Sequence, residues 1–324
     1  LWAGRFDRAS AWIGEMPADL AAQPRWRYWK ARALEQTAGA PAARPLYTKL
    51  ATLRDYYGYL AADRAKRPYE LNAGPLPADA KLQASLAADA GLRRARALFD
   101  CNLYDEATLE WAVALGDADA ATRTQAALLA SKWGWYAQSI ATLAQLGLWD
   151  DVRLRYPRPF AAAVAKAAAR THVNVDWIYA VMRQESLYRT QAVSSAGARG
   201  LLQVLPSTAN ALAKRWKLKL PTRDALFEPA PAILLGAAHL RELLDDYAGA
   251  LPLSLAAYNA GAVPVARWQP AARQQADIWI ENIPYPETRS YVQRVLEHIV
   301  AFAWVRHAPL PRLSGLMPPV GPAR

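Results

Sequence analysis

Helical periodicity, with almost no strand-like alternation, is the feature that most limits how this sequence can fold. Ala and Leu, which are strong helix formers, fill long segments, whereas the Val-Ile-Thr alternation typical of strands is almost absent. Hydrophobic residues make up 53% of the 324 residues, enough to form the cores of two or three domains. We therefore predict an all-α protein.

Proline and glycine divide the chain into three predicted domains. Before residue 78, short helical patterns in series indicate a helical solenoid, in which each helix pair covers the apolar face of its neighbour. Glycines at 91, 116, 134 and 147 punctuate a second block as expected helix stops. Two prolines within 156–159 bar helix and mark the best boundary. We predict domains at 1–77, 78–156 and 157–324.

Within the first domain, breaks are predicted at several prolines, including Pro45. Leu46, Leu50, Leu53 and Tyr57 then share one face of a predicted helix. Leu1 is not a start residue, and the first residues resemble the middle of a helix pair, so we expect no signal peptide and a C-terminal portion of a longer protein.

The charge and the single cysteine exclude several classes of protein. A formal net charge of +11 favours an anionic partner. The basic residues are scattered, however, and no zinc-finger or RNA-binding signature is present, so we expect no nucleic-acid partner. No apolar run reaches about 18 residues, so no membrane span is expected. Cys101 cannot form a disulfide within the chain, and we expect it to be a buried thiol.

The four histidines lack the spacing of metal ligands. The segment 197–200 also lacks the frame of a phosphate-binding loop. We therefore predict neither a metal nor another cofactor.

Glu185 stands out because it falls on the apolar face of a predicted helix. Ile178, Val181 and Met182 precede it by seven, four and three residues, while Asp176 is placed to cap the start of the helix. A carboxyl at such a position is either shielded from water, which raises its pKa, or turned out to solvent at the end of the stripe. A carboxyl that stays protonated near neutral pH can donate its proton to a leaving group, as a glycosidase acid does.

Three ordered blocks in the second half of the chain resemble the signature of the soluble lytic transglycosylases. They are 184–186 (QES) followed by 195–206 (SAGARGLLQVLP), 256–261 (AAYNAG) and 281–291 (ENIPYPETRSY). The resemblance implies an α-superhelical domain and a helical linker domain, followed by a lysozyme-like α domain. It also implies cleavage of the glycan strands of bacterial peptidoglycan and a periplasmic location. Partners in cell-wall synthesis or secretion stay unassigned.

The same resemblance implies roles for individual residues. Glu185 would act as acid and then as base, and Tyr258 would approach and orient it. Substrate-binding positions would be Ser194, Gln203, Asn259, Glu281 and Gly200, with Asn259 alternatively holding the turn at the end of its helix. Gly197 and Gly200 would let the loop backbone approach the glycan. Leu202 and Leu205 stand where relatives often carry Met, and Arg199 would meet an anionic peptide stem.

Two other functions remain open on the sequence alone. A goose-type lysozyme would use the same acid with an attacking water. A non-catalytic scaffold or murein-binding module would keep the helical platform without chemistry, although Glu185, Tyr258 and Gln203 are all intact, which argues against loss of activity.

Overall fold

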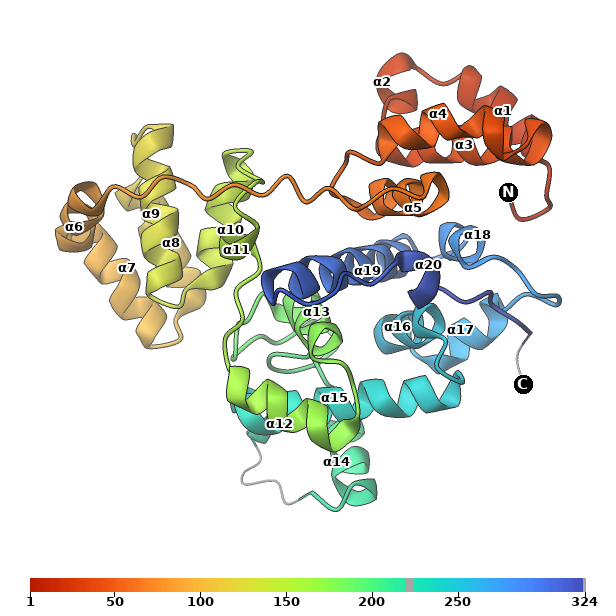
Figure 1. Ribbon diagram of the computed structural model, residues 1–324. Helices are drawn as coiled ribbons and strands as arrows, with labels where there is room; N and C mark the ends of the chain where they lie inside the picture. The colour runs from red at the N-terminus through yellow and green to blue at the C-terminus, as the bar shows by residue number, and fades with distance from the viewer. Residues whose placement is uncertain (219–223, 323–324) are drawn as a thin grey trace. The chain divides into compact units, whose positions relative to one another are not determined.

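The computed structural model describes residues 1–218 and 224–322 and confirms the all-α class (Figure 1). Within these residues the elements are helices, and extended backbone pairs only as isolated bridges. The chain separates into two compact units, one formed by 1–72, 171–180 and 237–324 and the other by 73–170 and 181–236. The predicted domain boundaries remain predictions.

The first unit joins the two ends of the sequence. Tyr28, Trp29 and Tyr59 are fully buried among its N-terminal helices, and α5 packs against α19 and α20. Its helices are α1 (Phe6–Gly14), α2 (Ala18–Ala21), α3 (Pro24–Ala38), α4 (Ala40–Leu50), α5 (Tyr56–Ala65), α16 (Leu251–Ala260), α17 (Ala262–Trp268), α18 (Ala276–Glu281), α19 (Pro286–Val305) and α20 (Leu313–Leu316).

The predicted break at Pro45 and the helix predicted after it were wrong. Pro45 lies inside α4, which ends at Leu50, and a separate helix begins at Tyr56 after Asp55 caps it by accepting from the Gly58 N–H at 2.7 Å. Pro45 removes one backbone hydrogen bond, but Tyr47 and Leu50 are buried and α4 packs on α3. Tertiary packing therefore outweighs the local cost of the proline.

The second unit contains antiparallel helix pairs with a Trp-rich core. Leu92, Trp111 and Trp135 are buried in one cluster contributed by α7, α8 and the turn before α10. The helices of this unit are α6 (Ala80–Ala88), α7 (Ala90–Asp100), α8 (Tyr104–Ala114), α9 (Ala120–Lys132), α10 (Tyr136–Gln145), α11 (Val152–Arg155), α12 (Ala161–Thr171), α14 (Pro206–Arg215) and the short 3₁₀ turn η1 (Ala225–Phe227).

Two expectations about this unit were wrong. Gly91 is not a helix stop but lies in the first turn of α7, where an added Cβ would come within 2.8 Å of the Ala114 Cβ. It permits close packing of α7 on α8. Cys101 is exposed at the end of α7 instead of buried. Gly134 and Gly147 do end helices, with φ of 81° and 68°.

Two helices near the candidate catalytic residues run from one unit into the other: α13 (Val175–Ser186) and α15 (Pro229–Asp246). Asp176 does not cap α13 as predicted. The Asn174 side chain accepts from the Asp176 N–H at 2.8 Å, and the Asp176 carboxylate instead accepts two hydrogen bonds from Arg306, at 3.0 and 2.9 Å. The ion pair holds the start of α13 to the end of α19, a contact without any local signature in the sequence.

Single residues account for several other features of the helix ends. Pro206 opens α14, where its missing N–H costs nothing, and Gly261 ends α16 with φ of 85°. Glu287 lies in the first turn of α19, where a negative charge suits the helix dipole. No helix of the described residues is long and apolar enough to cross a membrane.

Candidate active site

Glu185 lies in the last turn of α13 and is half-buried. The residues that share its stripe, Ile178, Val181 and Met182, are fully buried. The side chain therefore lies at the edge of the apolar face, between the two extremes considered from the sequence. A carboxyl at such an edge is partly shielded from bulk water and still accessible to a ligand.

Ser186, the residue after Glu185, fixes the end of α13. It is buried, and its hydroxyl lies 2.9 Å from the carbonyl oxygen of Leu201 and 3.2 Å from that of Met182, either of which can accept a hydrogen bond from it. The same oxygen accepts from the Tyr188 N–H at 3.1 Å. No role was predicted for Ser186, although it belongs to the first matched block. Ser186 holds the helix end that carries Glu185 against the segment 194–204, which we call the glycine loop.

The glycine loop is held by hydrogen bonds within itself. The Ser194 hydroxyl accepts from the Ala198 N–H at 3.1 Å, which shapes the turn at Gly197. The Gln203 side-chain amide donates to the carbonyls of Ala192 and Gly200, at 3.0 and 2.9 Å. The Gln203 side-chain carbonyl takes no hydrogen bond from the described residues, so it is the atom of this side chain that is available to a sugar hydroxyl or amide.

Gly200 approaches protein backbone and not, as predicted, a glycan. Its φ is 70°, and an added Cβ would lie 1.8 Å from the carbonyl oxygen of Leu226. Gly197 has a similar φ of 80°, but nothing lies within 4 Å of an added Cβ there. Gly200 is therefore required for packing of the loop, and Gly197 only for its turn.

Leu202 belongs to the core and not to a sugar-contacting surface. It is 1% exposed, and its side chain fills the space beside Gly236, where an added Cβ would come within 2.5 Å of it. Leu205 is exposed. The Arg199 guanidinium lies over the Phe227 ring at 5.6 Å from its centroid, and its backbone pairs with Val204 across the loop.

Tyr258 and Asn259 lie near the end of α16 in the other compact unit, and both are half-buried. The Tyr258 ring packs against the imidazole of His239 on α15, with centroids 4.9 Å apart. Asn259 accepts a hydrogen bond from the Thr288 hydroxyl at 2.6 Å. It thereby ties α16 to the first turn of α19 and does not stabilise the turn at Gly261 through its side chain.

Contrary to the prediction that it contacts substrate, Glu281 does not present its carboxylate to a cleft. It is 5% exposed, and one carboxylate oxygen forms an ion pair with Arg25 while the other accepts from the Tyr57 hydroxyl at 2.8 Å. The Tyr57 hydroxyl in turn accepts from Gln293 at 3.0 Å. Glu281 is a structural link between α3, α5 and α18, which leaves its carboxylate occupied by protein.

A second buried carboxylate, Asp277, extends this link. It accepts from Tyr28 at 2.8 Å, Arg32 at 2.9 Å and Arg64 at 3.1 Å. Burial raises the pKa of Asp277, but the two guanidinium groups and their hydrogen bonds outweigh burial and leave the pKa below its ordinary value. Burial beside this carboxylate also raises the pKa of the Tyr28 hydroxyl. We call this cluster, with Glu35, the Asp277 network.

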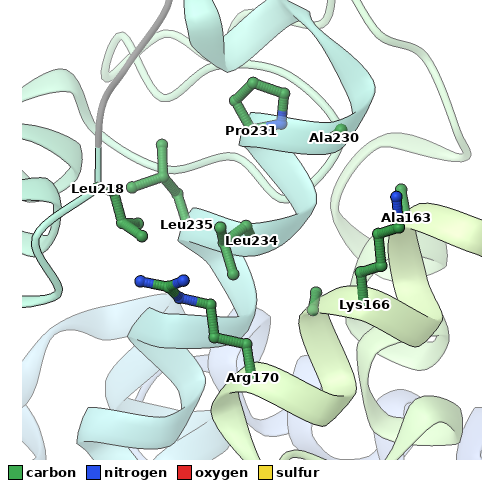
Figure 2. Close-up of a pocket in the computed structure, with 9 residues that line it drawn as sticks. Ala163, Lys166, Arg170, Leu218, Ala230, Pro231, Leu234 and Leu235 are labelled. Atoms are coloured by element: carbon green, nitrogen blue, oxygen red, sulfur yellow. The ribbon is translucent and has the colours of Figure 1, made fainter.

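A separate apolar pocket lies between α12 and α15 in the second unit (Figure 2). It has a volume of about 270 Å³, and Lys166 and Arg170 are its charged residues. None of the predicted site residues lines it, so it is distinct from the candidate catalytic residues. Within the described residues, no three acidic, His or Cys side chains are grouped to hold a metal ion.

Comparison with known families places these residues in a named context. Residues 162–280, which include Glu185, the glycine loop and Tyr258, match the transglycosylase SLT domain. Residues 85–152, which cover most of α6 to α11, match the L domain of soluble lytic murein transglycosylases.

Whole-chain relatives agree. A putative soluble lytic murein transglycosylase of Haemophilus influenzae is 31% identical over 89% of this chain and 48% of its own length. The soluble lytic murein transglycosylase of Escherichia coli K12 is 28% identical over 89% of this chain and 45% of its own length. The chain thus spans about half the length of these relatives.

Solved structures extend the likeness to three dimensions. An inactive mutant of the lytic transglycosylase Slt from Pseudomonas aeruginosa matches 95% of this chain and 51% of its own, with a TM-score of 0.88 and 37% identity. The 70 kDa soluble lytic transglycosylase of E. coli matches 97% of this chain and 50% of its own, with a TM-score of 0.86 and 26% identity. These matches confirm the predicted fold class, a helical solenoid followed by a lysozyme-like α domain.

The fold and the matched SLT and L domains define a protein of the lytic transglycosylase class. More specifically, the chain belongs to the soluble lytic transglycosylase family.

Proposed function

We propose that this protein is a peptidoglycan lytic transglycosylase that cleaves the MurNAc-β-1,4-GlcNAc bond without water. The observation that carries the proposal is Glu185. This half-buried carboxyl, at the edge of an apolar helix face, is tied through Ser186 to a loop that offers the Gln203 carbonyl. The SLT match over 162–280 supports the assignment.

In the proposed reaction, one carboxyl acts twice. Protonated Glu185 donates its proton to the glycosidic oxygen as the bond from that oxygen to C1 of MurNAc breaks, and an oxocarbenium-like charge develops on the ring. The C6 hydroxyl of the same sugar then bonds to C1 and returns its proton to the Glu185 carboxylate. The products are a 1,6-anhydroMurNAc end and a free GlcNAc hydroxyl. The balance requires neither a second carboxylate nor a water molecule.

The other candidate residues support this step. We assign Tyr258 to orienting the carboxyl and stabilising the developing positive charge through its hydroxyl oxygen. Gln203 accepts a hydrogen bond from the sugar, and Ser194 and Gly200 shape the loop that presents it. Asn259 keeps α16 in place through Thr288. We do not propose Glu281 as a substrate-binding residue, because its carboxylate is bound by Arg25 and Tyr57.

Peptidoglycan fits the charge of the chain as well as its family. Its peptide stems carry carboxylates, and a net charge of +11 attracts such a polymer over long distances. We propose a periplasmic location on the same grounds. A goose-type lysozyme, in which a water attacks C1, is the second candidate because it would use the same acid.

The deciding experiment is mass analysis of the products released from purified peptidoglycan. We expect anhydromuramyl ends from the wild-type protein, their loss in Glu185→Gln, and their retention in Glu106→Gln, which makes the same chemical change at an exposed position on α8. Reducing ends in place of anhydro ends would identify a hydrolase. Binding to peptidoglycan without any release by the folded wild-type protein would refute the enzymatic proposal.

A further inference from the structure

A second cavity in the unit formed by 73–170 and 181–236 has no assigned role. Its volume is about 250 Å³, and it lies between residues of α7, α8 and α10 on one side and the segment 187–190 on the other. The first group falls within the L-domain match, and the second directly follows Ser186 at the end of α13. We call it the L-domain pocket. Its far wall begins two residues after the candidate acid.

The backbone around the L-domain pocket adopts an uncommon conformation. Three bulky lining residues have positive φ: Phe160 at 56°, Leu187 at 47° and Tyr188 at 68°. Asn102, at 62°, is an ordinary left-handed cap that ends α7, with the Leu103 N–H donating to the Leu98 carbonyl at 2.9 Å. Side chains larger than glycine rarely adopt this region, and for bulky residues it costs free energy. Such conformations gather where the structure holds groups in place for a ligand. This observation is independent of the cavity itself.

The side chains of the L-domain pocket combine aromatic rings with hydrogen-bonding groups. Tyr104 donates to the Asn102 side-chain oxygen at 3.1 Å and can then accept from the Thr190 hydroxyl at 3.3 Å. Asn102 is exposed at the rim of the pocket, and this arrangement leaves its amide nitrogen as a donor without a partner among the described residues. The half-buried ring of Tyr136, which packs edge-on against Tyr188 at 5.7 Å, supplies an apolar surface.

A sugar ring matches this combination, since one of its faces carries only C–H groups while its rim carries hydroxyl and acetamido groups. A volume of about 250 Å³ lies just below the roughly 300–1,000 Å³ of sites that hold drug-sized ligands, which suits a single sugar residue. The charged lining residues Asp100 and Arg189 carry opposite charges, so the lining has no net charge, which suits a neutral ligand.

We propose that the L-domain pocket, which none of the candidate catalytic residues lines, is a binding subsite for one N-acetylated hexosamine residue of the glycan strand. Tyr136 stacks on the sugar ring and the Asn102 amide donates to one of its oxygens. The proposal rests on the proposed function for the identity of the polymer. It gives the L domain a direct part in holding substrate.

The test uses peptide-free glycan strands and the Glu185→Gln protein, in which binding is separated from cleavage. Isothermal titration calorimetry is run on this protein alone and with Tyr136→Ala, Asn102→Gly or Leu109→Ala added. Glycine accepts the φ of Asn102, so that substitution removes the amide without straining the backbone. Leu109 is 69% exposed on α8 and serves as the control. Isolated stem peptides are the second probe.

We expect Tyr136→Ala and Asn102→Gly each to weaken strand binding about three- to tenfold, the loss that corresponds to one stacking contact or one hydrogen bond. Leu109→Ala should bind as the parent does. In the active protein, the same two substitutions should raise KM for strands by a similar factor with kcat unchanged, which a purely structural role would not produce.

Strand binding by the folded Asn102→Gly and Tyr136→Ala proteins that equals that of the parent would overturn the subsite. The subsite would also be overturned if these variants bound stem peptides more weakly than the parent while their strand binding was unaffected. If Tyr136→Ala does not fold, Asn102→Gly decides alone. A wild-type protein that releases no anhydro products but binds strands through Tyr136 would refute the proposed function and leave the subsite standing.

Discussion

Two glycines in the same loop provide a matched test of how the loop is built. Gly197 and Gly200 have φ of 80° and 70°, so alanine at either position adopts a left-handed conformation that costs about 1–2 kcal/mol. At Gly200 the new Cβ would also lie 1.8 Å from the Leu226 carbonyl oxygen, a backbone atom that cannot rotate away. Overpacking of this kind adds about 1–3 kcal/mol.

Gly200→Ala should therefore lower the free energy of unfolding by about 2–5 kcal/mol and Gly197→Ala by about 1–2 kcal/mol. Alanine also restricts the unfolded chain, but equally in both variants, so this contribution cancels from the comparison. Urea denaturation followed by circular dichroism measures both values. Because the Gln203 amide donates to the Gly200 carbonyl, Gly200→Ala should also cost most of the activity on peptidoglycan.

Equal losses of stability in the two variants would refute this reasoning, because the structure places the clash at one glycine only. A Gly200→Ala protein as stable and active as wild type would show that the Leu226 segment moves freely. The conclusion that Gly200 serves loop packing would then be withdrawn.

Three further results are expected. Ser186→Ala should lower the unfolding free energy in urea by about 1–2 kcal/mol and reduce kcat more than KM, since it frees the helix end bearing Glu185 from the Leu201 carbonyl; unchanged kcat would contradict this. Glu281→Gln should leave KM for glycan strands unchanged while lowering Tm, and a raised KM with unchanged Tm would restore the substrate role. Asp277 has a lowered pKa, so the stability that its ionised form contributes is present at neutral pH and is lost as pH falls below 3.8, its ordinary pKa, toward its lower folded pKa. Asp277→Asn should lower the free energy of unfolding at pH 7 by about 3–5 kcal/mol and make that free energy fall less steeply at acidic pH. An equally steep fall would argue against the ion pairs.

Local features of this fold were readable from the sequence. The helix class, the start of α14 at Pro206 and the end of α16 at Gly261 each follow from a few neighbouring residues. Helical spacing placed Glu185 on the buried stripe of its helix, but its half-buried position at the edge of that stripe came from the structure. The three matched blocks identified the family because they combine short motifs in a fixed order.

Contacts between distant residues were not readable. Asp176 was assigned to a cap because nothing near it reveals Arg306, 130 residues further on. Glu281 was assigned to the substrate because its partner Arg25 lies 256 residues away. Gly91 was read as a stop, since the Ala114 that it packs against comes from the next helix. In each case the prediction relied on neighbouring residues, whereas the residue's role is set by a contact with another helix.

The Asp277 network also has a consequence for synthesis of the chain. Arg32 emerges from the ribosome 245 residues before Asp277, which at about 5–20 residues per second corresponds to a delay of roughly 12–50 s. Arg32 is fully buried in the finished protein, but during that interval it has only Glu35, three residues further along the chain, and not yet Asp277. The first 72 residues therefore complete their fold only after translation has passed the entire second unit. Nascent chains stalled before residue 277 should expose these helices to proteases and chaperones.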